Sequence, residues 1–323
     1  MRFVLSEEQR LFAGSLDKLL DQADTPSAIR AWSAGDHVPG RRVWTALAGA
    51  GVFALAVPEE HDGVGLLPVE LVTALHELGR HAVPGPLVET VAAAALLTAV
   101  GDTAWLPRIA AGEALVSLAT PDTLYALDAD VADLVLLVRD GELHEAEPGR
   151  ALRPSIDPSR RLFEVAPSRR LGKADATALD LAVLACAAQH LGLGRRLLDV
   201  SVDYAKTRNQ FGHPIGEYQA VKHQLADALI GLEFARPLVH AAALAHGTAD
   251  FRRDTSAAKI AAAESAYATA KTALQVHGAI GYTAEYDPSL WIRKARALHA
   301  AWSSPSAHRT RLMASLEGSP PPA

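Results

Sequence analysis

The feature of this sequence that most constrains its fold is the second half of the chain, where long apolar-periodic stretches are separated by short joints. The spacing of apolar residues predicts helices at about 175–208, 215–246, 251–279 and 288–317, the last one broken near Pro305. The chain is also rich in alanine and has only 6% aromatic residues, which favours packed helices. Helices of this length with short connections are typical of an antiparallel four-helix bundle, which we expect over residues 173–317.

Capping signals and apolar periodicity in the first part of the chain predict a separate set of helices over residues 1–112. Ser6 and Gln9 have the spacing of a capping box, in which each side chain binds the other residue's backbone N–H. The helix that follows is expected to end near Asp21. Further helices are expected at about 41–50, 68–80, 86–100 and 105–111.

Residues 113–172 have a different character, because short runs rich in valine and leucine alternate with Asp-Gly and proline breaks. This pattern predicts strands and hairpins, and the segment is long enough for a small barrel or sandwich at most. The expected fold is therefore mostly α-helical, with an N-terminal helical domain, a small truncated central β-domain and a C-terminal antiparallel four-helix bundle. Residues 318–323, with the sequence GSPPPA, are expected to be a disordered tail.

Composition argues against several classes of protein. A single cysteine rules out a disulfide framework and a cysteine-based zinc site, and it fits a reducing cytoplasm. A net charge of −6 with both signs interspersed gives no electrostatic reason to expect nucleic acid. The longest apolar stretch, residues 91–100, is too short to cross a membrane, and the first residues do not read as a signal peptide.

His76 and His81 lie about 140° apart around a helix, so they do not form a zinc pair, and we expect no metal.

The first informative constellation lies within residues 204–227. A long helix is expected to end near Arg208, so that Arg208, Gln210 and Phe211 place a guanidinium, an amide and a flat ring at one corner. Such a corner suits a dinucleotide, because arginine binds phosphate oxygens with a bidentate fork and a ring can lie against a heterocycle. A helix corner whose arginine satisfies the last carbonyl groups is an equally good interpretation of these residues alone.

The second constellation lies within residues 274–287. Gln275, Gly278 and Ala279 are predicted on one helical face, where small residues let a backbone or a pyrophosphate come close. The alternative is an ordinary helix end, in which Gly278 and Gly281 stop the helix and Tyr282 packs against it. Taken alone, this second interpretation is the better one.

Together the two stretches resemble the C-terminal bundle of the acyl-CoA dehydrogenase family, whose signatures are R-x-x-F-G-x-x-I-x-x-x-Q and Q-x-x-G-G-x-G. Residues 6–12 are similar to the opening helix of that family and residues 44–65 to its "leucine–glycine–proline–glutamate–glycine" segment, so the resemblance runs over about residues 5–311. It implies an N-terminal helical domain, a central β-domain and a C-terminal four-helix bundle. It also implies FAD-dependent α,β-dehydrogenation of an acyl-CoA thioester, with electrons passed to an electron-transfer flavoprotein.

The resemblance further implies a set of FAD-binding residues. In the family this set grips the adenosine diphosphate half of the FAD of a neighbouring subunit, across an interface. One position departs from the family pattern, because Ala279 stands where glycine is usual, and a single methyl group is a small change. By this resemblance the FAD-binding residues, here called the FAD clamp, are Arg208, Gln210, Phe211, Gln219, Gln275, Gly278 and Ala279.

The sequence also departs from the family at the catalytic base. The reaction needs a carboxylate that removes the α-proton while hydride leaves the β-carbon. The family places a glutamate late or early in the bundle, and these positions fall here on Trp302 and on Ala182 or Val183, none of which can accept a proton. Asp180 is the one nearby carboxylate, and its alternative role is that of an acid near a helix N-terminus. The segment 113–172 is also about half the size that the family uses to cover the flavin ring.

A chain that keeps the FAD clamp and lacks the base resembles the short subunit of bacterial α2β2 acyl-CoA dehydrogenases, known among steroid-degrading enzymes. In that arrangement a longer homologous subunit supplies the catalytic carboxylate, and the catalytic residue of this chain is unknown. Two alternatives remain open at this point. One is a self-sufficient homotetrameric dehydrogenase that uses Asp180, and the other is a non-catalytic helical scaffold subunit.

Overall fold

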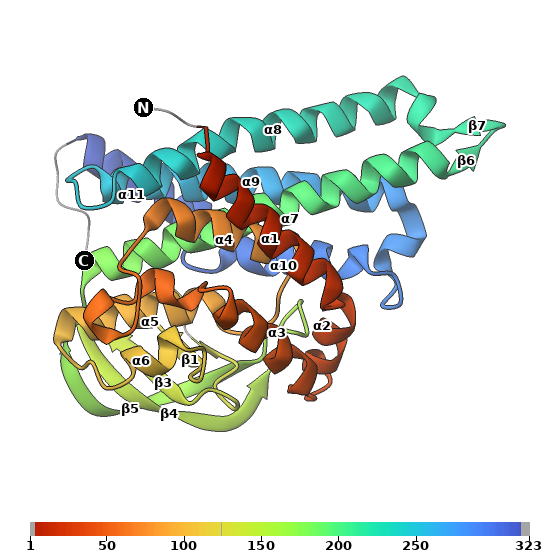
Figure 1. Cartoon of the computed structure of the whole chain (residues 1–323). Coiled ribbons are helices and arrows are strands. Elements are labelled where there is room, and N and C mark those ends of the chain that lie inside the picture. Colours follow the sequence, from red (N-terminus) through yellow and green to blue (C-terminus); the bar gives the residue numbers. More distant parts are fainter. Residues whose placement is uncertain (1–3, 124, 318–323) are drawn as a thin grey trace.

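The computed structural model describes residues 4–123 and 125–317, so the predicted disordered tail at 318–323 lies outside the described residues. A long helical bundle lies above an N-terminal group of helices and a small sheet in the view of Figure 1. The mostly α-helical fold with a small central sheet that the sequence predicts is confirmed. The division of the chain into domains at 1–112, 113–172 and 173–317 stays a prediction.

The N-terminal helices begin with the predicted capping box, which is confirmed because Gln9 N–H donates to Ser6 Oγ at 3.2 Å and Ser6 N–H donates to Gln9 Oε1 at 2.9 Å. One helix was not predicted, and it follows the first after two residues, with Asp24 as its N-cap in a left-handed conformation. The helices are α1 (Glu7–Gln22), α2 (Thr25–Ser33), α3 (Val38–Gly49), α4 (Pro68–Arg80), α5 (Leu87–Val100) and α6 (Leu106–Ala110), with short 3₁₀ turns η1 (Phe53–Ala56) and η2 (Glu59–His61).

The small sheet contains five strands in the order β1-β3-β4-β5-β2, with β1 and β3 parallel and the other pairs antiparallel. It curls until β2 lies beside β1, where Ser117 Oγ donates to the carbonyl oxygen of Leu127 at 2.6 Å. The predicted Asp-Gly break is the turn between β3 and β4, where Asp140 and Gly141 both have positive φ angles. The strands are β1 (Val116–Ala119), β2 (Ala126–Leu127), β3 (Leu134–Arg139), β4 (Glu142–Arg153) and β5 (Leu162–Lys173).

The bundle lies close to its predicted bounds. Its last predicted helix is divided by residues 301–304, where Trp302 and Ser303 have positive φ angles. The α7 helix is apolar and long enough to span a membrane, but 83% of its most apolar window is buried inside the protein, as expected of a core helix. The bundle helices are α7 (Ala176–Thr207), α8 (Gln219–Leu244), α9 (Phe251–His277), α10 (Pro288–Ala300) and α11 (Pro305–Leu316).

The bundle and the N-terminal helices are joined where α4 crosses α7. A Cβ atom built on Gly192 of α7 would lie 1.9 Å from the carbonyl oxygen of His76 on α4, and one built on Gly79 of α4 would lie 2.2 Å from the carbonyl oxygen of Gln189 on α7. Real Cβ atoms do not approach backbone this closely, so only glycine fits at these two positions. The two helix backbones therefore meet almost directly, and one continuous core runs through both groups of helices.

Replacing Gly192 with alanine should destabilise the protein by about 3 kcal/mol or more, because the new methyl group forces α4 and α7 apart. Gly14→Ala is the matched control, since Gly14 lies on α1 with open space around it and alanine favours helix by up to about 1 kcal/mol. Chemical denaturation of both variants measures the effect. Equal stability of the two variants would contradict the close crossing.

A second junction, between α2 and the sheet, contains a buried acid. Asp128 accepts a hydrogen bond from Trp32 Nε1 at 3.0 Å, while its other carboxylate oxygen has no partner within the described residues. Burial raises the pKa of Asp128 to about 7, against the smaller opposing effect of the Trp32 hydrogen bond. The carboxyl group is therefore largely protonated in the folded protein at slightly acid pH.

The raised pKa of Asp128 makes stability depend on pH in a definite direction. The stabilising contribution of the protonated carboxyl is fully present below the unfolded pKa near 3.8 and is lost as the pH rises through about 7. Asp128→Asn keeps the acceptor for Trp32 and tolerates the left-handed backbone at φ 53°. We expect this variant to match the parent protein near pH 4 and to be more stable by about 1–3 kcal/mol at pH 8. Thermal melts at both pH values measure this, and parallel pH profiles would contradict it.

Candidate functional site

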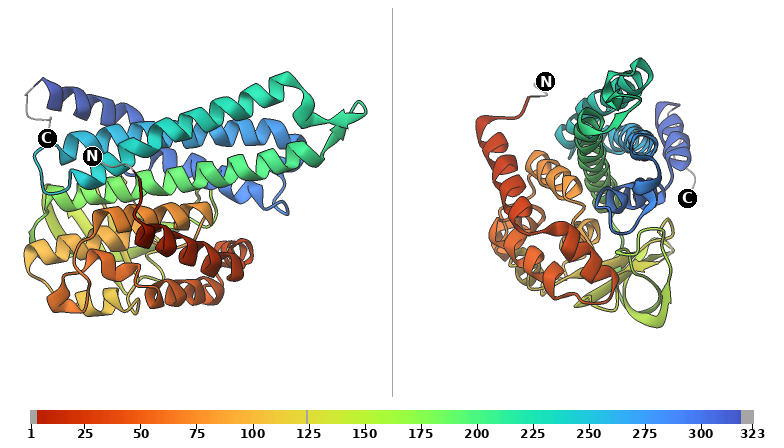
Figure 2. Two further views of the ribbon diagram at one scale, coloured as in Figure 1. Left: turned by 45° about the horizontal axis from the view of Figure 1, so that its top comes forward. Right: turned by 90° about the vertical axis from the view of Figure 1, so that its right-hand side faces the viewer.

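The first predicted constellation lies at the free end of an arm formed by the ends of α7 and α8, which Figure 2 shows projecting beyond the rest of the molecule. The arm ends in a hairpin of two short strands, β6 (Asn209–Gln210) and β7 (His213–Pro214), followed by the turn η3 (Ile215–Glu217). Phe211 and Gly212 form the two-residue loop, both with positive φ angles, as such hairpins require. Ile215 N–H donates to the Arg208 carbonyl at 2.7 Å and closes the base of the hairpin.

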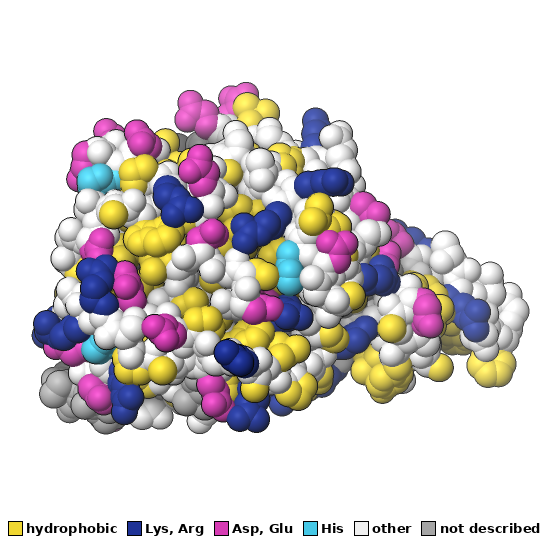
Figure 3. Space-filling view, turned by 90° about the horizontal axis from the view of Figure 1, so that it is seen from below, with side chains coloured by type: hydrophobic (Ala, Val, Ile, Leu, Met, Phe, Trp, Pro, Cys, Tyr) yellow, Lys and Arg dark blue, Asp and Glu magenta, His cyan; other side chains and the backbone are white. Residues whose placement is uncertain are grey.

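The side chains of this corner point outward. The Phe211 ring is 91% exposed, and Arg208 and Gln210 are also exposed. Hydrophobic side chains lie along the arm as far as its free end (Figure 3). The hydroxyl of Thr207, and not the Arg208 guanidinium, binds carbonyl groups in the last turn of α7. Among the described residues Arg208 has no ion-pair partner, so its guanidinium is available to a ligand.

The second constellation differs from the prediction of a single helical face. The α9 helix ends at His277, and Gly278 turns the chain away with φ 64° into the 3₁₀ turn η4 (Gly278–Tyr282). Gln275 is therefore in the last turn of α9, whereas Gly278 and Ala279 belong to the turn, because a residue with that backbone conformation cannot continue a helix. All three are exposed. Tyr282 is 75% exposed, so the packing predicted for it in the alternative interpretation is wrong.

The two constellations lie at the same end of the bundle. An aromatic contact joins them, since the rings of Tyr204 on α7 and His277 on α9 lie 4.5 Å apart between centroids. The His277 ring is itself held by its Nδ1 contact with the carbonyl of Ala273 at 2.8 Å and by Tyr286, whose ring lies 5.3 Å away. Gln219 starts α8 beside the hairpin and is exposed. The fold thus groups the predicted FAD clamp residues at one end of the bundle, on α7, α8 and the end of α9.

Trp302, on which the late position of the family's glutamate falls, follows the end of α10 opposite to the turn η4. Trp302 is buried, at 3% exposure, in a small cavity between α5, the sheet and the bundle. Only about 10 Å³ of this cavity is open, which is room for about one water molecule. The lining residues of this cavity, here called the closed pocket, are Val83, Gly85, Leu87, Val88, Glu89, Leu127, Ser159, Arg160, Gln189, Lys294, Leu298 and Trp302.

Charged side chains fill much of the closed pocket. Lys294 Nζ lies 3.0 Å from Asp157 Oδ2 and donates to Ser159 Oγ at 3.2 Å, and Ser159 Oγ donates to Asp157 Oδ1 at 2.7 Å. Burial by itself would raise the pKa of Asp157, but the Lys294 charge and the Ser159 hydrogen bond together lower it. The pocket is therefore closed by the Lys294–Asp157 ion pair as well as by apolar side chains.

Sequence reasoning missed Glu89 in this pocket. Its side chain is buried, and burial raises the pKa of its carboxyl although the charges of Arg160 and Lys294 oppose the rise. A signal was present in the sequence, because Glu89 is the one charged residue in the otherwise apolar run of α5. Burying a single carboxyl group in an apolar helix costs free energy unless neighbouring groups pair with it or hydrogen-bond to it.

The structure places Asp180 away from the closed pocket. Asp180 lies nine residues before Gln189 on α7, so it is about 13 Å distant along the axis and points to the opposite side of the helix. Its carboxylate is buried and forms an ion pair with Arg311 of α11. Burial raises the pKa of Asp180, and the Arg311 charge opposes the rise. Ala182 and Val183 are buried in the core.

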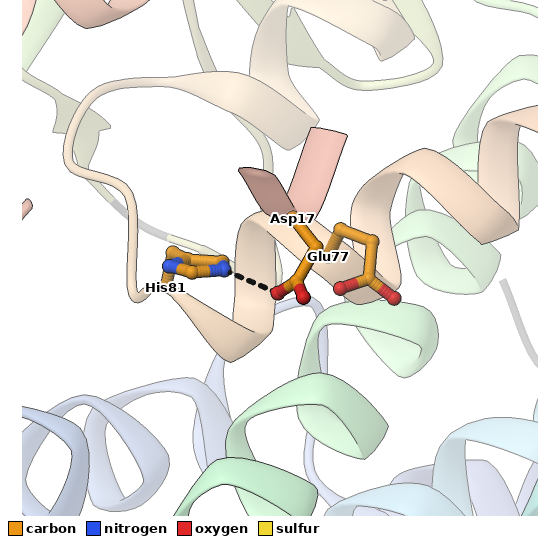
Figure 4. Close-up of side chains that lie close together, drawn as sticks. All are labelled: Asp17, Glu77 and His81. Carbon is orange, nitrogen blue, oxygen red and sulfur yellow. Dashed lines mark hydrogen bonds and ion pairs between the residues drawn. The ribbon is translucent and has the colours of Figure 1, made fainter. Parts of the chain in front are cut away.

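A further cluster of titratable groups joins α1 to α4 (Figure 4). His81 Nε2 lies 2.8 Å from Asp17 Oδ1, and Glu77 lies one turn before His81 on α4. The guanidinium of Arg80 sits 3.8 Å from Glu77 Oε2 and 3.9 Å from Asp17 Oδ1. Because Arg80 already supplies positive charge to both acids, we interpret this cluster as an ion-pair network that fastens the first helix.

Comparison with known proteins gives matches along most of the chain. Residues 6–113 match the acyl-CoA dehydrogenase N-terminal domain, and residues 173–302 match the acyl-CoA dehydrogenase C-terminal domain. The acyl-CoA dehydrogenase IpdE2 of Mycolicibacterium smegmatis is 32% identical over 320 residues, which cover 97% of this chain and 100% of IpdE2.

Two solved structures show the same fold over nearly the whole chain. The ChsE4–ChsE5 complex from Mycobacterium tuberculosis has a TM-score of 0.85 at 23% identity, covering 99% of this chain and 100% of that one. The Tcur3481–Tcur3483 steroid ACAD has a TM-score of 0.84 at 24% identity, covering 97% and 98%.

The environment of Asp180 predicts a structural role. Asp180→Ala should cost about 3 kcal/mol, because it leaves the Arg311 guanidinium without its partner in a largely buried position. The double variant Asp180→Leu with Arg311→Met should recover most of that loss, since it removes both charges and keeps the volume. Urea unfolding of the single and double variants measures the coupling. A loss below about 0.5 kcal/mol in Asp180→Ala, the scale of an exposed pair, would refute the structural role.

Proposed function

The chain belongs to the acyl-CoA dehydrogenase family, and from this premise we propose that it is the short subunit of a two-component, FAD-dependent acyl-CoA dehydrogenase. The family consists of oxidoreductases that act on acyl-CoA, and its cofactor is FAD. In this proposal the chain contributes the FAD clamp, while a longer homologous chain contributes the catalytic carboxylate and holds most of the cofactor.

The exposed side chains at the end of the bundle are evidence in favour of the proposed FAD clamp. Arg208 can bind phosphate oxygens through its bidentate fork, and the side-chain amides of Gln210 and Gln275 can donate further hydrogen bonds. The exposed ring of Phe211 offers a flat apolar surface. None of these side chains is buried, so a cofactor held by a neighbouring chain can reach them without any rearrangement of the core.

The closed pocket is the main observation in favour of a chain that depends on a partner chain for its activity. The position where the family has its catalytic glutamate is occupied by Trp302, and the pocket around it has about 10 Å³ of open space. A flavin ring does not fit into a space of one water molecule. The residues present therefore fit the diphosphate end of FAD at the arm and do not fit its ring within this chain.

In the proposed reaction FAD, when bound, accepts the hydride that leaves the β-carbon of the acyl group. The α-proton must be taken by a carboxylate that the substrate can reach. Glu89 is enclosed in the closed pocket, where about one water molecule fits, and burial raises its pKa, so it is not placed to act as this base. Asp180 is bound to Arg311, and Trp302 has no basic group. We therefore assign the proton transfer to the partner chain and the binding and orientation of the diphosphate to this chain.

A partner chain is also supported by the surface of α8. Ile230, Phe234 and Leu238 are exposed and lie four residues apart, so they form an apolar stripe along one side of the helix. Contiguous exposed apolar surface of this kind marks interaction sites. IpdE2 matches this chain over its full length, and both solved neighbours are named as pairs of different proteins.

The remaining parts of the proposal rest on the relatives. One solved neighbour is named a steroid ACAD, so we propose a bulky, ring-bearing acyl-CoA as the substrate class. We further propose a cytoplasmic α2β2 assembly that passes its electrons to an electron-transfer flavoprotein.

The proposal is tested by co-expression with a longer acyl-CoA dehydrogenase encoded beside this chain. We expect a yellow complex that dehydrogenates acyl-CoA, while the chain alone contains little FAD and is inactive. In the complex, Arg208→Ala should weaken FAD binding about tenfold to a hundredfold, because a charge-assisted bidentate contact is lost. Bound FAD, measured by absorbance after gel filtration, gives the result.

Lys206→Ala is the matched control for the arm. Lys206 is also exposed near the end of α7, but its ammonium group pairs with Asp203. This variant should keep its FAD. Stoichiometric FAD and full activity in the chain alone would overturn the dependent role, and unchanged FAD content in the Arg208→Ala complex would support a scaffold subunit instead.

A further inference from the structure

The predicted FAD clamp has two halves on separate elements, and the side chain between them is His277. One half is the end of the arm, residues 208–219, and the other is the end of α9 with the turn η4, residues 275–282. Figure 1 shows the end of α9 beside α7, near the base of the arm. No hydrogen bond or ion pair links residues 208–219 to residues 275–287 within the part of the chain that the structure describes. The two halves are bridged by ring contacts at His277 instead.

The His277 ring reaches the arm through Tyr204. The centroids of the two rings lie 4.5 Å apart, and the angle between the ring planes is 33°, which is a favourable arrangement for an aromatic pair. Tyr204 lies one turn before Arg208, and its carbonyl accepts the Arg208 N–H at 2.8 Å. The backbone that carries the Arg208 guanidinium is therefore fixed to the residue that His277 contacts.

The same ring also contacts the segment that contains η4. The centroid of the Tyr286 ring lies 5.3 Å from that of His277. A Cβ atom built on Gly281 would lie 3.5 Å from the Cβ of His277, so the turn η4 folds back over this histidine. His277 thus touches both halves of the clamp, although it is not itself one of the clamp residues.

Arg30 of α2 fastens the segment that carries Tyr286. Its guanidinium donates to the carbonyl groups of residues 284 and 285 at 3.2 and 3.1 Å, and it forms an ion pair with Asp287 at 2.7 Å. The segment is therefore tied to the N-terminal helices. The Tyr286 ring is a fixed support against which the His277 ring packs.

The orientation of the His277 ring is itself fixed. The side chain is 4% exposed, and its Nδ1 donates to the Ala273 carbonyl at 2.8 Å, because a carbonyl oxygen can only accept. Nε2 is buried and has no partner among the described residues. Burial lowers the pKa of His277 against the smaller effect of the Ala273 hydrogen bond, so the ring packs as a neutral group.

We propose that His277 is a positioning residue of the FAD clamp, whose ring keeps the Arg208 half and the Gly278 half in fixed relative positions so that one cofactor contacts both. The role rests on the proposed function, in which both halves bind FAD. His277 needs no contact with the cofactor, since it acts through Tyr204 and the backbone of η4. The position requires a flat ring, because an aliphatic side chain gives the two tyrosine rings no shared aromatic neighbour.

The test measures the dissociation constant of FAD from the co-expressed complex, by fluorescence titration of the FAD-free complex. His277→Leu should weaken FAD binding about threefold to tenfold, because both ring contacts are lost. His277→Phe keeps a flat ring and should stay within about twofold of the parent. His246→Leu is the matched control, since His246 makes a ring contact of 4.9 Å with Phe251 at the opposite end of the bundle, and it should leave FAD binding unchanged.

A double-mutant cycle separates positioning from a general loss of stability. In the Arg208→Ala complex, His277→Leu should cost no more than about twofold in FAD affinity, since the guanidinium that His277 positions is gone. A larger loss in that complex means that the two residues act independently and overturns the proposal. Unchanged FAD affinity in His277→Leu also overturns it, and so does a loss in His277→Phe as large as that in His277→Leu.

Tyr286→Leu covers the case in which His277→Leu does not assemble with its partner. Tyr286 is half-buried, and its replacement removes one ring contact while the bond from His277 to the Ala273 carbonyl remains. This variant should weaken FAD binding about twofold or more, and unchanged affinity would count against the positioning role.

The same measurements distinguish this inference from the proposed function. If Arg208→Ala loses FAD and neither His277→Leu nor Tyr286→Leu does, the short-subunit role stands and the role of His277 is removed. If Arg208→Ala binds FAD as the parent does, the clamp itself is wrong, and the proposed function fails together with this inference.

Discussion

The close crossing of α4 and α7 is the constraint on which the other parts of this structure depend. Gly79 and Gly192 let the two backbones meet without side chains between them, so the N-terminal helices and the bundle share one core. Because α7 is held along its first half, its second half can project beyond the body and present Arg208 at the end of an arm. The position of Arg208 is thus set by packing that lies several helical turns away from it.

The same crossing brings α5, the sheet and the bundle together around the closed pocket. Lys294 forms an ion pair with Asp157 and a hydrogen bond with Ser159 there, and Trp302 stands where the family would have a base. Buried ionic groups rarely add much net stability, but breaking one member is costly, so such a cluster resists being opened. The region around the closed pocket joins the N-terminal helices, the sheet and the bundle. The exposed side chains that can bind a ligand lie at the end of the bundle instead.

Much of the fold could be read from local patterns. The capping box at Ser6, the turn at Asp140 and the stop at Gly278 each depend on neighbouring residues, and each is present. Helix α2 escaped prediction because only two residues separate it from α1 and its cap, Asp24, requires a left-handed backbone that pattern alone does not indicate. The prediction that Gln275 and Ala279 share a helical face failed because spacing does not reveal where a helix ends.

The sequence by itself determined the family and the helical bundle, and it predicted the clamp residues, since periodicity and short motifs are local properties. The tertiary structure decided what surrounds each residue. It paired Asp180 with Arg311 and enclosed Glu89 and Trp302 in one pocket. These outcomes depend on contacts between residues a hundred or more positions apart, and the charge and space around a side chain follow from such contacts, which no local pattern records.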